Sequence, residues 1–192
     1  QMCIRDSDYI MEAHDLFRKI ELGRIDDTSK SKPVAFAGSG ICAGIGTEIG
    51  LACHRRFLSS SKNSKIGLPE ILVGLFPGLG GTTRVPRMMG LMGASSVLLE
   101  GKLFTSNKAK SIGLVDEVVS EDELIQKAKD WVLSASPKEL VKPWDQKGFK
   151  FPGGAPYHPS GFMSFVGASA LVNGKTKGCL LYTSPSPRDK RQ

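Results

Sequence analysis

The stretch KPVAFAGSGICAGIGTE, residues 32–48, decides the fold, together with IGLPE at 66–70 and FPGLGG at 76–81. The apolar run at 34–37 follows Pro33, which suits the first position of a strand because proline has no backbone donor to lose. A glycine-rich turn then leads to Glu48, after which apolar residues continue at helical spacing. This order predicts a strand, a glycine turn and the start of a helix.

Two glutamates mark this stretch as a candidate site. Glu48 and Glu70 are the only acidic residues between Asp27 and Glu100, and each lies near glycines that let backbone approach a ligand closely. Two carboxylates can share the acid and base roles around one water, and free N–H groups at a helix start can stabilise negative charge on a substrate oxygen. The residues alone leave two other interpretations open: a merely tight glycine connection, and two solvated surface acids.

The composition is that of one soluble globular domain with a sizeable core. The chain has 192 residues, 40% of them hydrophobic and 23% charged, and no apolar run approaches the roughly 20 residues of a membrane span. The net charge of +7 is scattered and lacks interleaved aromatic residues, so we predict no nucleic-acid partner. Four cysteines without metal-type spacing and no recognisable signal peptide predict no metal site and a reduced, cytoplasmic compartment.

The remaining sequence predicts a series of short elements. Asp8 is expected to cap a helix with an apolar stripe that ends at Gly23, and the spelling Ser-Glu-Asp-Glu at 120–123 is expected to cap another helix from Leu124. The other expected elements are a polar linker at 24–30, strands at 56–58 and 114–119, a loop at 59–63, and helices at 82–89, 93–101, 106–112 and 162–172.

Two groups of side chains carry weaker signals. Arg84 and Arg87 are three residues apart on one helix face, where they would meet a phosphate or, as the alternative, be solvated or paired with carboxylates. The three histidines share no spacing, so we expect them to be surface or packing residues, and the two tryptophans to be core anchors. A complete dinucleotide-binding fingerprint is absent from the sequence.

The central motifs resemble the enoyl-CoA hydratase/isomerase family, also called the crotonase family. GICAGIGTE at 40–48 is similar to its glycine-rich turn and first glutamate, and IGLPE at 66–70 with GLFPGLGG at 74–81 is similar to its second glutamate and the loop that follows. GLVDEVV at 113–119 and KPWDQKGFK at 142–150 resemble the hydratase domain of multifunctional β-oxidation alpha subunits, in which a 3-hydroxyacyl-CoA dehydrogenase follows. The resemblance covers about residues 8–178.

This resemblance implies a fold and a reaction. The fold would be α/β, a crotonase-type (ClpP/crotonase) β-β-α spiral core, incomplete here, with a C-terminal helical region. The reaction would be the hydration of 2-enoyl-CoA to 3-hydroxyacyl-CoA, with Glu48 and Glu70 holding the water, one accepting its proton and the other delivering a proton to C2. The substrate itself carries coenzyme A, and the basic charge of the chain suits such a ligand. Hydration needs no cofactor, and NAD would serve only a downstream dehydrogenase domain.

Four further residues take roles from the resemblance. The N–H of Ile45, in the turn Gly44-Ile45-Gly46, would stabilise the thioester oxygen, and Gly78 would lie beside the water. The family usually has glycine where Ile45 stands, and a β-branched side chain is expected to strain the turn or crowd the thioester. Two alternatives therefore stay open: an enoyl-CoA isomerase, which the same two acids would serve, and a non-catalytic acyl-CoA-binding member.

The two ends differ from the middle. QMCIRDS at 1–7 and CLLYTSPSPRDKRQ at 179–192 resemble translated adaptor or vector sequence, with a natural disordered tail as the alternative for the second. Residues 8–178 are then expected to be a partial hydratase domain, because the family's first strands and its second oxyanion donor precede anything matched here. The resemblance also implies a homo-oligomer or a complex with a thiolase subunit.

Overall fold

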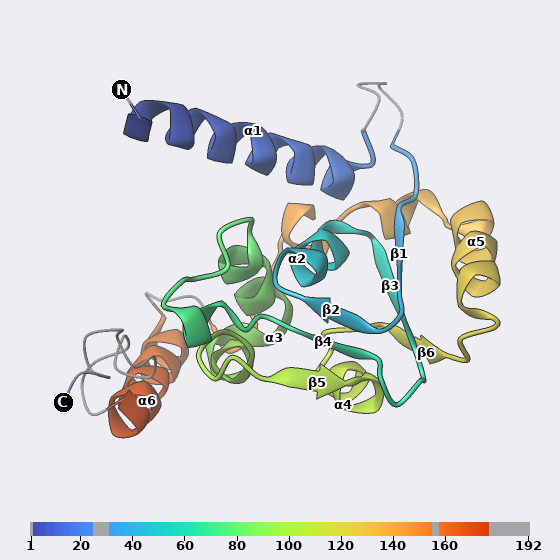
Figure 1. The fold of residues 1–192 in the computed structure, drawn as a ribbon. Helices are drawn as coiled ribbons and strands as arrows, with labels where there is room; N and C mark the ends of the chain where they lie inside the picture. The colour runs from blue at the N-terminus through green and yellow to red at the C-terminus, as the bar shows by residue number, and fades with distance from the viewer. Residues whose placement is uncertain (1, 25–30, 155–157, 177–192) are drawn as a thin grey trace.

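The computed structural model describes residues 2–24, 31–154 and 158–176. Two small sheets occupy the middle of the molecule, with α1 (Met2–Leu22) lying across one end and α6 (Pro159–Thr176) at the other (Figure 1). Helix α5 (Leu124–Ser134) packs beside β1 (Ala35–Gly38) and β3 (Arg55–Ser59), while α2 (Ile45–Ala52) also packs against these two strands. The arrangement is an α/β fold with helices around a sheet core.

The first four strands alternate between the two sheets. One sheet has the order β1-β3-β6, all parallel, with β6 at Glu117–Val119. The other has the order β2-β4-β5, with β2 at Ile41–Ala43, β4 at Lys65–Gly67 and an antiparallel β5 at Leu103–Thr105. Each of the units β1-β2-α2 and β3-β4-α3 therefore sends its first strand to one sheet and its second to the other, which is the expected β-β-α pattern.

The helices fall close to their predicted positions. Helix α3 (Gly81–Leu98) is broken at Gly90, whose φ is 74°, so its two parts correspond to the two helices expected at 82–89 and 93–101. The remaining helical elements are α4 (Ser106–Ser111) and the 3-10 turns η1 (Glu70–Val73), η2 (Pro137–Leu140) and η3 (Pro143–Asp145). Within the described ranges, none of the helices combines the length and the apolar character needed to cross a membrane.

Strand β3 joins two hydrophobic clusters. Its neighbours Phe57 and Leu58 are both buried, and because successive side chains of a strand point to opposite faces, they enter different clusters. Phe57 packs with the apolar face of α5, and Leu58 packs in the larger cluster. The buried members of that larger cluster are Leu51, Leu58, Ile66, Leu68, Val85, Ala94, Val97, Phe104, Ala109, Leu114 and Val115.

Three local predictions were wrong. Asp8 does not cap α1, because the helix begins at Met2. The stretch 38–48 is not a continuous turn, since it contains β2, which pairs with β4. Helix α5 forms where it was expected, but Ser120 Oγ donates to the Glu123 carboxylate at 2.9 Å instead of capping backbone N–H groups. The linker at 25–30 and the tail at 179–192 lie outside the described residues.

Candidate active site

The glycine turn before α2 exposes the start of a helix. Gly44 is the N-cap, with φ 57° and ψ −123°, a conformation that residues with a Cβ rarely adopt. Its N–H donates to Gly67 O at 3.0 Å, and Gly67 N–H donates to the buried Thr47 Oγ1 at 3.1 Å. The turn is thus tied to β4 at its base. The sequence analysis missed Thr47, although a hydroxyl in the first turn of an apolar helix signals such a bond.

Ile45 is the first residue of α2, and its N–H points out of the helix start. The first N–H groups of a helix have no intrahelical acceptor, and a Cβ built on the neighbouring Gly46 would meet nothing within 4 Å. The Ile45 side chain is 56% exposed. The strain expected at this position is not found, because the left-handed φ falls on Gly44 while Ile45 is helical.

Glu48 lies one turn into α2 and is buried, with 2% of its surface exposed. Its Oε1 accepts hydrogen bonds from Leu79 N–H and Gly81 N–H, both at 2.8 Å. Gly81 begins α3, and the N-cap Gly80 has φ 106°, which turns both donors toward the same oxygen. Both hydrogen bonds are to the same carboxylate oxygen, so two backbone donors fix the direction of the Glu48 carboxylate.

Glu70 begins η1 and approaches the same turn from the other side. A Cβ on Gly44 would lie 3.3 Å from Glu70 Oε1, so the carboxyl lies against the turn that presents the Ile45 N–H. Glu70 Oε2 is buried and finds no hydrogen-bond partner within the described chain. Burial raises the pKa of Glu70, and the negative charge of Glu48 raises it further. Glu70 therefore holds a proton more readily than a solvated glutamate does.

Gly78 lies in the loop between η1 and α3, directly before the Leu79 N–H that holds Glu48. It is exposed, and a Cβ there would meet only Phe76 O, at 3.9 Å. Three segments far apart in the sequence, at 44–48, at 70 and at 78–81, thus meet at the start of α2. This region contains all six residues singled out from the sequence: Gly44, Ile45, Gly46, Glu48, Glu70 and Gly78.

The two arginines of α3 differ in environment. Arg84 is buried and paired with Glu21, whereas Arg87 is exposed. The carboxylate-paired alternative is therefore correct for Arg84. No cluster of three or more His, Cys, Asp or Glu side chains suited to a metal ion occurs among the residues that the structure describes.

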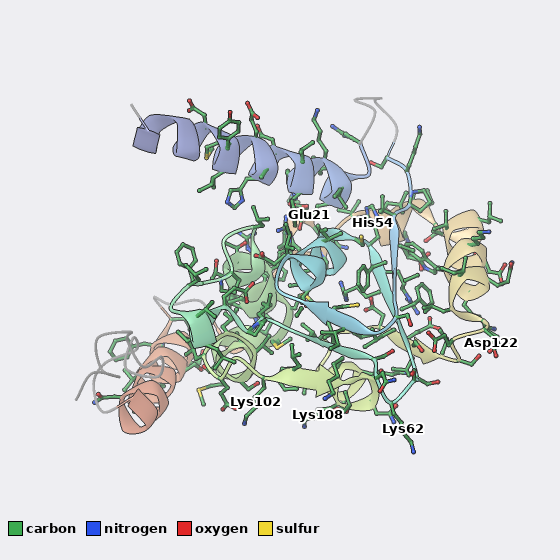
Figure 2. The ribbon with its side chains drawn as sticks, in the orientation of Figure 1. Glu21, His54, Lys62, Lys102, Lys108 and Asp122 are labelled. Carbon is green, nitrogen blue, oxygen red and sulfur yellow. The ribbon has the colours of Figure 1, made fainter. Side chains whose placement is uncertain are left out.

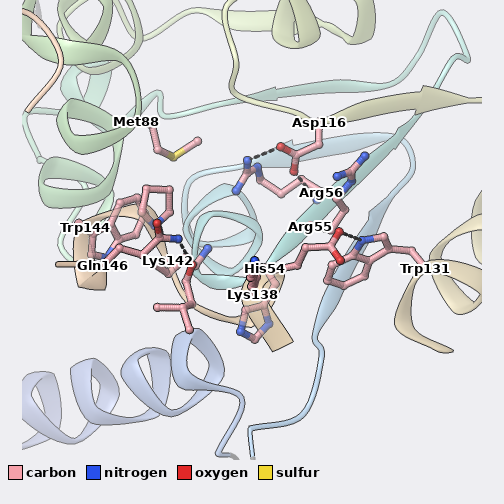
Figure 3. A pocket seen from close by; sticks show the side chains of 13 residues that line it. His54, Arg55, Arg56, Met88, Asp116, Trp131, Lys138, Lys142, Trp144 and Gln146 are labelled. Atoms are coloured by element: carbon pink, nitrogen blue, oxygen red, sulfur yellow. Dashed lines mark hydrogen bonds and ion pairs between the residues drawn. The ribbon is translucent and has the colours of Figure 1, made fainter. Parts of the chain in front are cut away.

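The opposite end of α2 carries a cavity of about 290 Å³ (Figure 3). Lys142 lines it and donates from Nζ to Leu51 O at 3.1 Å and Cys53 O at 2.6 Å, at the carbonyl end of the helix. Burial lowers the pKa of Lys142 to about 8. None of the predicted site residues lines this cavity. The two glutamates and the open N–H groups lie at the other end of α2.

Comparison with known proteins decides the family. A sequence model of the family described as enoyl-CoA hydratase/isomerase matches residues 15–141. The chain belongs to this family. Its fold is similar to the crystal structure of an enoyl-CoA hydratase from Bacillus anthracis, with a TM-score of 0.59 and 30% identity, over 70% of this chain and 48% of that one.

Similar sequences of the enoyl-CoA hydratase/isomerase family occur within much longer proteins. The chain is 37% identical over 167 residues to a fatty acid oxidation complex subunit alpha of Shewanella loihica, covering 87% of this chain and 22% of that protein. It is 39% identical over 129 residues to a glyoxysomal fatty acid beta-oxidation multifunctional protein of Cucumis sativus, covering 66% of this chain and 17% of that protein. The chain thus spans about a fifth of the length of these curated relatives.

Proposed function

We propose that this chain carries the acid–base pair of an enoyl-CoA hydratase, which adds water across the 2,3-double bond of a 2-enoyl-CoA in fatty-acid β-oxidation. The observation that carries the proposal is the meeting of Glu48 and Glu70 at the open start of α2. Glu48 is fixed by two backbone donors, and Glu70 lies against Gly44 with a raised pKa. These different environments suit a base and an acid.

The reaction uses the pair in one cycle. Glu48 accepts a proton from the water as its oxygen bonds to C3, while Glu70 delivers its proton to C2. The thioester oxygen gains negative charge during this step, and the Ile45 N–H at the helix start stabilises it. Transfer of the water's proton from Glu48 to Glu70 then restores both groups. General acid–base catalysis of this kind contributes about 10²- to 10⁴-fold to a rate.

The experiment is a hydration assay with a 2-enoyl-CoA, followed by product analysis. We propose that the second oxyanion donor of the family belongs to a segment N-terminal to residue 8, so the chain alone should turn over slowly. The chain extended by the corresponding N-terminal segment of the Shewanella loihica relative should form 3-hydroxyacyl-CoA. Binding of acyl-CoA without turnover in this extended chain would favour a non-catalytic role instead.

An enoyl-CoA isomerase is the second candidate, because two acids beside one turn could also move a proton between C2 and C4. The family description includes both activities. A 3-enoyl-CoA substrate separates the two, since an isomerase converts it to the 2-enoyl product in the absence of net hydration. If the 2-enoyl substrate is converted to 3-hydroxyacyl-CoA and the 3-enoyl substrate is not converted, the result supports the hydratase.

The names of the relatives suggest a wider setting. These names include a complex and a multifunctional protein. From these names together with the sequence resemblance described above, we propose that the domain works beside an NAD-dependent 3-hydroxyacyl-CoA dehydrogenase, in a complex with a thiolase subunit or as a homo-oligomer, in a bacterial cytoplasm. The unbroken reading frame on both sides of the sequence tests the dehydrogenase directly. Co-purification of the protein encoded by that frame with a thiolase would support the complex.

A further inference from the structure

A buried ion pair joins α1 to α3 close to the candidate site. Arg84 is 6% exposed and Glu21 is 4% exposed. Arg84 Nε donates to Glu21 Oε1 at 3.1 Å, and Nη2 donates to Oε2 at 3.3 Å. Figure 2 shows Glu21 at the end of α1 that lies over α2. Burying two charges is costly even when they are paired, so the pair invites a functional explanation.

The third donor of Arg84 supplies that explanation. Its Nη1 donates to Leu79 O at 3.1 Å, and the guanidinium lies so close to Gly80 that a Cβ there would have no room. Leu79 N–H is in turn one of the two donors to Glu48 Oε1, and Gly81 N–H is the other. The guanidinium therefore binds the turn 79–81 through Leu79 O, while the Leu79 and Gly81 N–H groups of the same turn bind Glu48.

We propose that Arg84, held in place by Glu21, is a positioning residue for Glu48. Glu21 fixes two nitrogens of the planar guanidinium, which leaves the third aimed at Leu79 O. This contact sets the orientation of the Leu79 and Gly81 N–H groups and so the direction of the Glu48 carboxylate. The catalytic consequence rests on the function proposed above, but the geometric one does not.

The residues around the pair provide controls. Arg18 Nη1 contacts Glu21 Oε2 at 2.7 Å, and both Nη atoms of Arg18 donate to the Asp145 carboxylate at 2.9 Å. The Arg18–Asp145 ion pair anchors α1 and does not contact the turn at 79–81. Asp145→Asn therefore weakens this ion pair and leaves the Arg84–Leu79 hydrogen bond in place. Arg87→Lys changes an exposed cation on the same helix as Arg84 and is the matched control for charge and position.

The test is an NMR titration of the full 192-residue chain. Protonation of Glu48 should shift the Leu79 and Gly81 amide signals, because both N–H groups donate to its carboxylate. Glu48→Gln supplies the reference in which this pH-dependent shift is absent. Arg84→Lys keeps a cation for Glu21 but cannot supply three donors in one plane, so both amides should lose most of their shift. Arg87→Lys and Asp145→Asn should retain it.

A double variant separates positioning from general stability. Removing one member of a buried pair is strongly destabilising, whereas replacing both by apolar residues is often neutral or stabilising. Arg84→Met/Glu21→Met should therefore fold, yet still lack the amide shifts. Normal shifts in Arg84→Lys or in the double variant would overturn the proposal. Failure of the double variant to fold would also overturn it, by showing that Arg84 serves the fold as a whole.

Turnover of the extended chain then tests the catalytic consequence. Misplacing a catalytic group by about 1 Å can cost on the order of 100-fold, so Arg84→Lys should lower kcat about tenfold to a hundredfold with little change in KM. Altered amide shifts in a chain that hydrates no enoyl-CoA would refute the proposed function and leave the positioning role standing. Unaltered shifts in an active chain would refute the positioning role alone.

Discussion

The two ends of α2 differ in whether a side chain satisfies their backbone groups. At its carbonyl end, the buried Lys142 ammonium donates to Leu51 O and Cys53 O and lies 5.4 Å from the centre of the Trp144 ring. At its amide end, no side chain caps the helix: Glu48 Oε1 accepts from the Leu79 and Gly81 N–H groups, and Glu70 Oε2 finds no partner among the described residues. The fold thus satisfies the carbonyl end with a lysine side chain and leaves the amide end without a side-chain cap.

The helix dipole explains why this difference matters. A helix carries about half a positive charge at its amide end and half a negative charge at its carbonyl end. A cation at the carbonyl end interacts favourably with the dipole, but for Lys142 the cost of burial outweighs this gain and lowers its pKa, so the main contribution of Lys142 is its hydrogen bonds to Leu51 O and Cys53 O. An anion at the amide end would also interact favourably with the dipole, and the acids near this end are Glu48, in the first turn of α2, and Glu70, which lies against Gly44. In the proposed reaction, the thioester oxygen that becomes negative would meet the open N–H groups of this end.

The largest expected effect comes from removing a proton-transfer group at the amide end. In the extended chain, Glu48→Gln or Glu70→Gln should lower kcat for 2-enoyl-CoA hydration by about 10²- to 10⁴-fold, because glutamine keeps the shape but transfers no proton. The measurement is steady-state hydration, with Glu12→Gln, an exposed site on α1, as the matched control. Full activity in both glutamine variants would refute the site assignment.

A smaller effect is expected at the carbonyl end. Lys142→Met should lower the free energy of unfolding by about 1–3 kcal/mol, because Leu51 O and Cys53 O lose their donor in a buried setting. Turnover by the extended chain should stay close to normal, since the glutamates lie at the other end of the helix. Urea unfolding measures the first effect. A large loss of kcat without loss of stability would show that the two ends are not separate.

The pH dependence of this difference sharpens the comparison. Burial lowers the pKa of Lys142 from 10.5 to about 8 in the folded chain. Between these values the unfolded chain holds more protons, so the contribution of Lys142 to stability rises with pH in that window. The stability of the wild-type chain relative to Lys142→Met should therefore increase from pH 8 to pH 10. A constant difference would show that the ammonium keeps its proton throughout.

Local sequence patterns were sufficient to predict the elements whose own residues form an apolar run. The apolar run at 34–37 became β1, and the run at 56–58 became β3, whose two faces are both buried. Strand β2 was missed because it has three residues and an exposed Ile41 within a glycine-rich stretch. Its extended form depends on pairing with β4, more than 20 residues away, and spacing within a single segment does not reveal such a partner.

The spatial grouping of the candidate site residues was predictable to the same degree. Two acids among glycines pointed to residues 48 and 70, because close approach of backbone requires glycine. The partners that fix Glu48 were not predictable, since Leu79 and Gly81 act through backbone N–H groups that any residue offers. Likewise, Glu21 and Arg84 are 63 residues apart, and nothing in their local spelling indicates that both are buried. Residue type reveals the chemistry, whereas tertiary packing decides how it is held.

A fourth prediction concerns stability at the amide end. Because burial and the Glu48 charge raise the pKa of Glu70, the folded chain binds its proton more tightly than the unfolded chain does. Stability contributed by the protonated form is then lost as pH rises above the unfolded value of 4.5. Glu70→Gln, which never ionises, should be more stable than wild type at pH 7, and the gain should disappear below pH 4.5.

Thermal unfolding of both proteins across this range measures the effect, again with Glu12→Gln as the control. A stabilised Glu70→Gln that has lost hydration activity would show that the amide end sacrifices stability for function. Equal stability at pH 7 would mean that the Glu70 carboxylate is fully satisfied in the folded chain.

The smallest effect is expected from trimming the chain, which should leave both ends of α2 unchanged. Helix α1 is anchored through its last turns, where Phe17 is 7% exposed and Glu21 is buried, while Tyr9 nearer its start is 69% exposed. Deleting residues 1–7 and 179–192 should therefore change the free energy of unfolding by no more than about 0.5 kcal/mol.

A longer deletion is the contrasting case. Deleting residues 1–22 removes Phe17 and leaves Arg84 buried without its carboxylate, which should lower the free energy of unfolding by about 3–5 kcal/mol. Denaturant unfolding of the two shortened chains beside the full one makes the comparison. A loss of several kcal/mol from the shorter deletion would show that the terminal segments belong to the folded domain, and that their resemblance to adaptor sequence is misleading.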